Sequence, residues 1–512
     1  MEDSPIDKDL SCNEIRLKKT LGEGADIVYR SLVIPSFSNV KALLVFIDGL
    51  VNTNEIDDTI LAPLISFSQL PDQKELINNE GLLNGLIDAG VFASSVKATN
   101  KWNDACDSLV SGDSVLFVDG MENAFIFATR GFESRSVTEP ATEVEVRGPR
   151  DGFIESLRTN TTLIRRRIRD YGLRFDMMRI GYRTKTDIAV AYIDSLVDKR
   201  VLGELMSRLQ KINVDSILES GYIEEFIEDS PLSPFPQVEH TERPDKASAA
   251  ILSGRIVIIV DNTPFVLIVP TSFWSLFQGS GDYYERFYIG TSIRLIRILA
   301  MILSITSSSV YVLLSSFNQE MLPTPLALKM AAGREGIPFP AVLEVLIMEL
   351  MFEVLREAGI RIPKPIGQAV SIVGALVIGD AAVNAGLVSP TAVIVVAITG
   401  ISSFVMPAYN LAISFRLLRF PLVIFTGMFG MLGFLGGTIA IALHLLSLRS
   451  FGAPFLAPVM PFRIDENKDV AVRAPWWKMT RRPKLAHSSE TIRQSENQMP
   501  KPPSKDEDGF DE

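Results

Sequence analysis

Long uncharged stretches dominate the second half of the chain. Residues 298–317, 381–415 and 420–448 contain no Asp, Glu, Lys or Arg. Uncharged apolar stretches of about 20 residues or more are typical of helices that span a membrane. The first half is rich in charged residues, and its apolar runs are short. The pattern predicts a soluble front half and a membrane-embedded back half, and it excludes a freely soluble enzyme.

Short apolar runs in the first half predict strands that alternate with helices. Residues 41–50 and 114–120 each contain an apolar run that ends in Asp-Gly, as a buried strand followed by a turn does. Helical spacing follows the first run at residues 54–67, and residues 124–129 are the expected hairpin partner of the second. This alternation predicts an α/β lobe.

A second lobe is expected after a polar linker. Its first helix is predicted at residues 152–169, and a pair of strands follows at residues 174–180 and 186–193. Another helix is predicted at residues 195–210. A proline-rich loop then leads to a strand at residues 255–260.

The back half predicts a bundle of membrane helices. We expect spans at residues 293–317, 366–385, 389–410 and 419–448. Because both termini are expected on the cytoplasmic side, an even number of spans fits best. We therefore favour four spans and leave residues 341–358 out of the count.

Four charged residues share one face of the helix predicted at residues 341–358. They are Glu349, Glu353, Arg356 and Glu357. Charged side chains are costly against lipid, so this face should contact protein or water. Two interpretations stay open: an interior or re-entrant helix, and an amphipathic helix lying at the membrane surface.

Together these elements predict the fold class. We expect an α/β cytoplasmic N-terminal region of two lobes, followed by an α-helical multi-pass transmembrane domain. The predicted divisions are an N-terminal extension (1–40), a first lobe (41–145), a second lobe (150–260), an interfacial segment (263–290), a transmembrane helical domain (291–450) and a cytoplasmic tail that is disordered at its end (451–512).

The helix predicted at residues 366–385 has two distinct stripes. Small side chains let helices approach closely in a bilayer, and one stripe provides them: Gly367, Ser371, Gly374, Ala381 and Ala385. The other stripe is an apolar ladder with a polar end, which suits a pore that closes by dewetting: Val370, Val373, Val377, Asp380 and Asn384. Ordinary helix packing, with Asp380 at the headgroup level, explains the same pattern, so both interpretations stay open.

Charge and composition narrow the possible functions. The net charge is −11, from 50 Lys and Arg against 61 Asp and Glu, which argues against a general nucleic-acid binder. Two cysteines and three widely separated histidines predict neither a disulfide framework nor a local metal site. The acidic N-terminus lacks the features of a cleavable signal, so the front half is expected in the cytoplasm. No cofactor is expected.

Candidate chemistry in the front half is weak. Asp48 and Asp119 follow predicted strands, where turn chemistry is the more common role of Asp-Gly. We find no nucleophile paired with a base and no phosphate-binding loop, so we do not expect an enzyme. The basic run at residues 165–169 suits nucleic acid or lipid headgroups, or else a solvated helix face or a contact with another subunit.

Several longer motifs resemble those of the GerA-type spore germination receptor A-subunit family. The resemblance extends from about residue 20 to residue 485. The motifs that carry it are VEVRGPRDGFIESLRTNT (144–161), DNTPF (261–265), PTPLAL (323–328), GREGIPFP (333–340), PIGQAV (365–370) and RAPWW (473–477).

The resemblance implies a nutrient receptor subunit in the inner membrane of bacterial spores. In such receptors this subunit acts with a transporter-like B subunit and a C-subunit lipoprotein. The resemblance also implies that A subunits form a homo-oligomer that encloses an ion channel. A membrane transporter, or a scaffold subunit without its own pore, is the alternative. A transporter would need substrate sites at broken helices, and we find no convincing inverted repeat.

Overall fold

The computed structural model divides into two compact units. It describes residues 4–34, 40–62, 64, 96–131, 139–140, 143, 145–361, 379–462, 466–486, 488 and 490–500. The sheet unit comprises Met1–Glu228, Val238–Pro270 and Met479–Glu512, and the helical unit comprises Asp229–Gln237 and Thr271–Lys478. The helical unit therefore contains the long uncharged stretches of the sequence.

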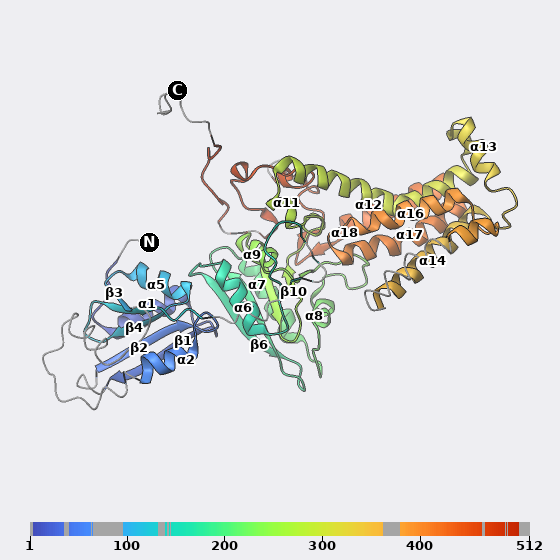
Figure 1. The fold of residues 1–512 in the computed structure, drawn as a ribbon. Helices are drawn as coiled ribbons and strands as arrows, with labels where there is room; N and C mark the ends of the chain where they lie inside the picture. Colours follow the sequence, from blue (N-terminus) through green and yellow to red (C-terminus); the bar gives the residue numbers. More distant parts are fainter. Residues whose placement is uncertain are drawn as a thin grey trace, which may run out of the picture. The chain divides into compact units, whose positions relative to one another are not determined.

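The first lobe of the sheet unit is a five-stranded antiparallel sheet covered on both faces. Its elements are α1 (Leu10–Leu21), β1 (Ile27–Ile34), β2 (Val40–Ile47), α2 (Thr53–Glu55), η2 (Ile56–Leu61), β3 (Val96–Thr99), α5 (Trp102–Ser111), β4 (Ser114–Val118) and β5 (Ala124–Phe127). The strand order is β1-β2-β4-β5-β3. α1 and α5 bury Leu17 and Leu109 against one face, whereas η2 buries Ile56 and Ile60 against the other (Figure 1).

The second lobe contains another five-stranded antiparallel sheet. Its elements are α6 (Leu157–Arg167), β6 (Leu173–Ile180), β7 (Thr186–Ile193), α7 (Lys199–Lys211), α8 (Ser220–Ile227), β8 (Glu239–Thr241), α9 (Pro244–Leu252), β9 (Ile256–Val260) and β10 (Val266–Val269). The strand order is β6-β7-β9-β10-β8. Leu163 of α6 and Ile251 of α9 pack in one buried core with Val257 and Ile259 of β9.

The two lobes have the same topology. When the strands of each lobe are numbered in chain order, both sheets follow the order first, second, fourth, fifth, third. The register also agrees: β1 and β2 begin their pairing at Ile27↔Ile47, and β6 and β7 at Leu173↔Ile193. Thr99 of β3 faces β5 just as Thr241 of β8 faces β10.

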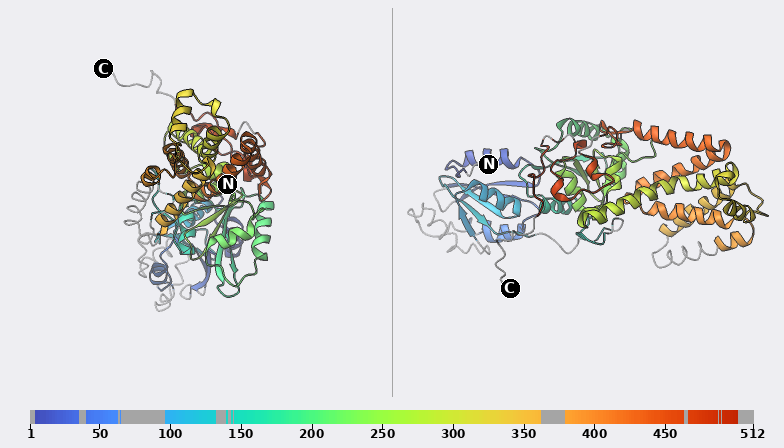
Figure 2. Two further views of the ribbon diagram at one scale, coloured as in Figure 1. Left: turned by 90° about the vertical axis from the view of Figure 1, so that its right-hand side faces the viewer. Right: turned by 90° about the horizontal axis from the view of Figure 1, so that it is seen from above.

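The helical unit is built from long apolar helices. Its elements are α10 (Phe273–Phe277), α11 (Gly281–Tyr284), α12 (Phe287–Ser316), η4 (Gln319–Met321), α13 (Thr324–Ala332), α14 (Ala341–Arg361), α16 (Pro390–Phe404), α17 (Tyr409–Phe429), α18 (Met431–Ser447), β11 (Arg449–Ser450), β12 (Ala453–Pro454), η5 (Asn467–Asp469) and η6 (Trp476–Lys478). α12 packs against α16 and α17, and α17 packs against α18, so these helices run side by side (Figure 2). By length and composition, α12 and α17 could each cross a membrane, and α16 and α18 are shorter apolar helices.

All six predicted strands are confirmed, but several other elements were not predicted. β2, β4, β5, β6, β7 and β9 lie at the predicted apolar runs. The elements that were not predicted from the sequence are α1, β1, β3, α5, α8, β8, α9 and β10. The helix predicted from residue 152 begins only at Leu157, because Ser156 is its N-cap and accepts a hydrogen bond from the Thr159 backbone.

Three predictions for the back half need correction. Residues 266–269, expected in an interfacial segment, form the buried strand β10 between β9 and β8. The span predicted at 389–410 ends at Phe404, shortly before Pro407, and proline disfavours helical backbone in the residue before it. The span predicted at 419–448 is two helices, because Gly430 has a φ of 59° and ends α17.

Candidate functional site

A cluster of charged side chains lies buried among the helices of the helical unit. Arg419 of α17 is 0% exposed, and its Nη2 lies 2.7 Å from Glu349 Oε2 and 3.1 Å from Glu353 Oε1, both on α14. Ser308 of α12 donates a hydrogen bond of 2.6 Å to Glu349. The hydroxyls of Ser308 and Thr399 of α16 are 3.3 Å apart. Four helices therefore meet at one polar group of side chains, which we call the Arg419 cluster.

A second buried carboxylate lies at the N-terminus of α16. Glu344 of α14 is 0% exposed and accepts a hydrogen bond from the Ser389 backbone. Ser389 is the N-cap of α16, since its hydroxyl accepts from Ala392 N at 3.2 Å. The positive end of the α16 dipole therefore faces the Glu344 carboxylate and stabilises its charge. Tyr311 of α12 completes the contact through a 3.0 Å hydrogen bond with Ser389.

The Arg419 cluster combines strong pairing with incomplete hydrogen bonding. Within the described residues, Arg419 Nε and Nη1 have no hydrogen-bond partner, and neither have Nε and Nη2 of Arg416, which is 4% exposed. Charged groups in an apolar bundle are costly unless paired, so their presence usually marks function or a fixed helix arrangement. The charged face of residues 341–358 was expected to contact protein or water, and for Glu349 and Glu353 the contact is with protein.

Sequence reasoning missed the central residue of this cluster. It placed Arg419 at the start of a span, whereas the residue lies in the middle of α17 and is buried. The available signal was the pair Arg416 and Arg419, one helical turn apart in an otherwise apolar stretch.

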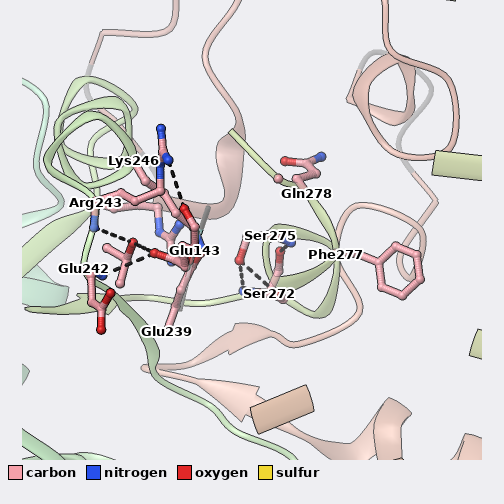
Figure 3. A network of polar contacts seen from close by, with 12 residues as sticks. Glu143, Glu239, Glu242, Arg243, Lys246, Ser272, Ser275, Phe277 and Gln278 are labelled. Carbon is pink, nitrogen blue, oxygen red and sulfur yellow. Dashed lines mark hydrogen bonds and ion pairs between the residues drawn. The ribbon is translucent and has the colours of Figure 1, made fainter. Parts of the chain in front are cut away.

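The sheet unit contains a separate network of buried charges, shown in Figure 3. Lys246 of α9 contacts Glu143 at 3.0 Å and Glu239 of β8 at 3.1 Å. Arg255 contacts Glu239 at 2.7 Å. Burial alone would raise the pKa of Glu239, but the charges of Lys246 and Arg255 outweigh it and lower that pKa to about 2. The two carboxylates in turn raise the pKa of Lys246 despite its burial. The network ties Glu143, which precedes the second lobe in sequence, to that lobe.

Comparison with known proteins places the chain in a family. Residues 15–485 match the model for the Bacillus/Clostridium GerA spore germination protein. The chain belongs to the GerA family. The resemblance noted in the sequence is thereby confirmed, and the chain is a member of the spore germination receptor family.

The GerA relatives extend over nearly the whole chain. Spore germination protein KA of Bacillus subtilis (strain 168) is 45% identical over 97% of this chain and 90% of its own length. The uncharacterized membrane protein YfkQ of the same organism is 46% identical, over 94% of this chain and 92% of its own. The N-terminal domain of the A subunit of the Bacillus megaterium spore germinant receptor GerK3 is 36% identical, with a TM-score of 0.42, over 53% of this chain and 99% of that chain.

Both stripes predicted for residues 366–385 lie mostly outside the described residues. Of the pore stripe, Val370, Val373 and Val377 lie outside, and Asp380 and Asn384 lie in the helical residues 379–384 and are exposed in the single chain. The packing stripe has Gly367, Ser371 and Gly374 outside, whereas Ala381 in the same helix and Ala385 in the following turn are exposed. Both stripes therefore stay predictions.

Two arginines of the basic run at residues 165–169 have a role that was not among the expected ones. Arg165 is buried, and its Nε lies 2.7 Å from Asp26 Oδ2 of the first lobe. Arg167 pairs with Asp151 at 2.5 Å. Two of these arginines therefore hold parts of the same chain together instead of forming a solvated face.

The strand-end aspartates do act as turn and cap residues in this GerA-family chain. Asp48 accepts a hydrogen bond from Gly49 N at 3.1 Å, and Asp119 accepts one from Leu10 N at 3.3 Å at the start of α1.

His444 forms a 2.9 Å hydrogen bond with Ser233, as a packing residue does. In the part of the chain that the structure describes, no group of three or more His, Cys, Asp or Glu residues could hold a metal ion.

Proposed function

We propose that this chain is the A subunit of a nutrient-responsive germinant receptor in the inner membrane of a bacterial spore. The observation that carries the proposal is the GerA match over residues 15–485, together with 45% identity to spore germination protein KA over 97% of this chain. The subunit is not an enzyme and works by conformational coupling. Its helical unit is a multi-pass membrane domain, and the sheet unit lies in the cytoplasm.

The receptor contains more than this chain. We infer that it assembles with a transporter-like B subunit and a lipoprotein C subunit, and that several A subunits form a homo-oligomer. The Arg419 cluster supports a helix bundle with a defined arrangement, because buried charges keep their partners only in one packing. Such a bundle can move between two discrete packings when a partner binds nutrient.

The homo-oligomer encloses an ion channel in this proposal. Val370, Val373 and Val377 line it and exclude water when closed, and Asp380 and Asn384 form a cation-attracting mouth. The small residues on the neighbouring stripe pack against adjacent helices: Gly367, Ser371, Gly374, Ala381 and Ala385.

Pore lining can be tested by single substitutions. Val373→Ala or Val377→Ala shortens the apolar barrier, so spores should release cations and germinate without nutrient. Cysteines at 373 and 377 should react with water-soluble thiol reagents in the activated receptor. If these reagents label cysteines placed at 371 and 374 but never those at 373 and 377, the valine stripe does not line a pore. A transporter, or a scaffold subunit without its own pore, would then be favoured.

The receptor role is tested by removing the gene from spores that contain no other receptor. Loss of the optical-density decrease that follows nutrient addition, restored by the intact gene, is the expected result. B- and C-type subunits should also co-purify with the tagged chain. Normal germination of the deletion spores would overturn the proposal.

A further inference from the structure

The two lobes of the sheet unit share individual hydrogen bonds as well as strand order. Leu10 N at the start of α1 donates to Asp119 Oδ1 at 3.3 Å, and Leu157 N at the start of α6 donates to Asp261 Oδ1 at 3.1 Å. Each aspartate directly follows the fourth strand of its lobe. The helix that precedes the first strand is therefore fixed in the same way in both lobes.

A buried asparagine repeats the same pattern. Asn13 of α1 exchanges hydrogen bonds with the backbone of Asp7, and Asn160 of α6 does so with Ile154, each across six residues. Both asparagines are almost fully buried. These bonds make Leu10 equivalent to Leu157 and Asn13 equivalent to Asn160, so α1 and α6 can be compared position by position.

Within one chain, α6 is the surface by which the second lobe docks on the first. Arg165 forms its buried ion pair with Asp26, and Arg158 pairs with Asp48. Thr162 lies against the turn after β2, where a Cβ on Gly49 would come within 2.3 Å of its hydroxyl. The docking surface of α6 is thus basic, and the surface that receives it is acidic.

The equivalent surface of α1 is uncovered. The positions of α1 that correspond to Arg158, Thr162 and Arg165 are Ser11, Ile15 and Lys18. Ile15 is 69% exposed, whereas Thr162 is 7% exposed. The side chain of Lys18 is 37% exposed against 3% for Arg165, and it pairs with Glu14 of the same helix at 2.9 Å. The neighbouring Lys19 is also exposed. α1 therefore presents the apolar Ile15 and the lysines of its last turn to solvent.

The second lobe also has an uncovered counterpart of the receiving surface. Asp48 N donates to Asp26 O, and Asp194 N donates to Gly172 O, so Asp194 corresponds to Asp48 and Ser195 to Gly49. Asp194 and Ser195 are exposed, as is Asp170, which accepts a hydrogen bond from Gly172 N at 2.6 Å. Gly172 occupies the position that Asp26 has in the first lobe, and Asp194 pairs with Lys199 at the start of α7. The carboxylates on this edge are therefore those of Asp194 and of Asp170, which lies two residues before Gly172.

We propose that α1 of one copy docks on the Asp170 and Asp194 edge of the second lobe of the next copy, through a contact that repeats the one between the two lobes of a single chain. The partner is therefore another copy of this chain, and the inference rests on the homo-oligomer proposed above. Lys18 and Lys19 at the end of α1 have the opposite charge to the Asp170 and Asp194 carboxylates, so these groups are complementary. A head-to-tail contact of this kind generates a ring when its rotation closes.

The proposed contact between copies has a larger separation than the equivalent contact of α6 inside one chain. Ser195 stands at the position of Gly49, so the helix of the neighbouring copy must lie further from the turn. The longer Ile15 side chain replaces Thr162 and fills part of that distance.

Cysteine crosslinking of the full-length chain in native membranes tests the contact. Cys12 is exposed on α1 and Cys106 is buried, so both are first replaced, by Ser and Ala. Ile15→Cys with Ser195→Cys should then give disulfide-linked multimers on mild oxidation. Ile15→Cys with Glu204→Cys, on an exposed part of α7, should give none. Gly49→Cys with Thr162→Cys is the control for the contact inside one chain and should give crosslinked monomer alone.

Charge reversal provides the second arm of the experiment. Lys18→Glu with Lys19→Glu should abolish the Ile15–Ser195 crosslink, and adding Asp170→Lys with Asp194→Lys should restore it. If an amine-reactive crosslinker still traps multimers while the Ile15–Ser195 pair never forms, this contact is wrong and the oligomer stands. If neither reagent traps multimers, the oligomer of the proposed function fails together with the contact.

Discussion

The Arg419 cluster allows a quantitative prediction about the helical unit. Replacing Arg419 with Met leaves the Ser308 hydroxyl as the partner of the buried Glu349 carboxylate among the described residues, while Glu353 keeps its contact with Arg356. Removing one partner of a buried ion pair costs about 3–5 kcal/mol, because the other charge stays buried without compensation. Arg419→Met should therefore strongly lower the stability of the folded protein.

A second substitution should restore most of that loss. Glu349→Leu in the Arg419→Met background removes the uncompensated charge, and replacing both charges with apolar groups of similar size is often close to neutral. The two changes should therefore be strongly non-additive, with a coupling of about 2–3 kcal/mol, as expected for residues in direct contact.

α14, the helix that contains Glu349, supplies a matched control. Arg361 and Glu357 form an ion pair 2.7 Å long, with side chains 78% and 56% exposed. Exposed pairs contribute about 0–1 kcal/mol, so Arg361→Met should have little effect. For both variants we would measure the thermal unfolding midpoint in detergent and the amount of protein in spore membranes. A fall in midpoint for Arg419→Met no larger than that for Arg361→Met would refute the role of the buried pair, as would a larger fall after adding Glu349→Leu.

Three further predictions concern other parts of the chain. Arg165→Ala should lower the unfolding midpoint of the full-length protein by leaving Asp26 unpaired, whereas the same change at the exposed Arg179 should not. Glu239 has a pKa of about 2 in the folded protein against an ordinary value of 4.5. Its ionised form therefore stabilises the fold above pH 4.5 by on the order of 3 kcal/mol, and this stabilisation is lost as the pH falls toward 2. Glu239→Gln should therefore destabilise at pH 7 and flatten the dependence of the unfolding midpoint below pH 4.5. Gly430→Ala should destabilise the α17–α18 turn by about 1 kcal/mol or more through its positive φ, measured as a lower midpoint with Gly436→Ala as control.

Local hydrophobic pattern predicted those parts of the fold that depend on it. The apolar runs at β2, β4 and β9 are buried on both faces, so their sequences alone distinguish them from loops. β8 has only three residues, and so short a strand in a polar stretch shows no alternation of apolar and polar positions. β10 is as apolar as a membrane-surface segment, and only its pairing with β9 and β8 shows that it is a strand.

The candidate site shows the same limit. The charged face of α14 could be predicted because Glu349 and Glu353 lie one turn apart on one helix. Their partner Arg419 lies on a different helix, and a single sequence contains no information on which helices meet. The equivalence of the two lobes was also hidden, because it rests on backbone register and hydrogen bonds at Asn13 and Asn160 more than on shared residues.

The most direct test of the receptor account is the early release of monovalent cations from spores after nutrient addition. The measurement compares spores in which this chain and its partners form the sole receptor with spores that lack only this chain. Rapid nutrient-dependent release is expected in the first and none in the second, with release before nutrient addition in Val373→Ala spores. Equal release from both kinds of spore would contradict it.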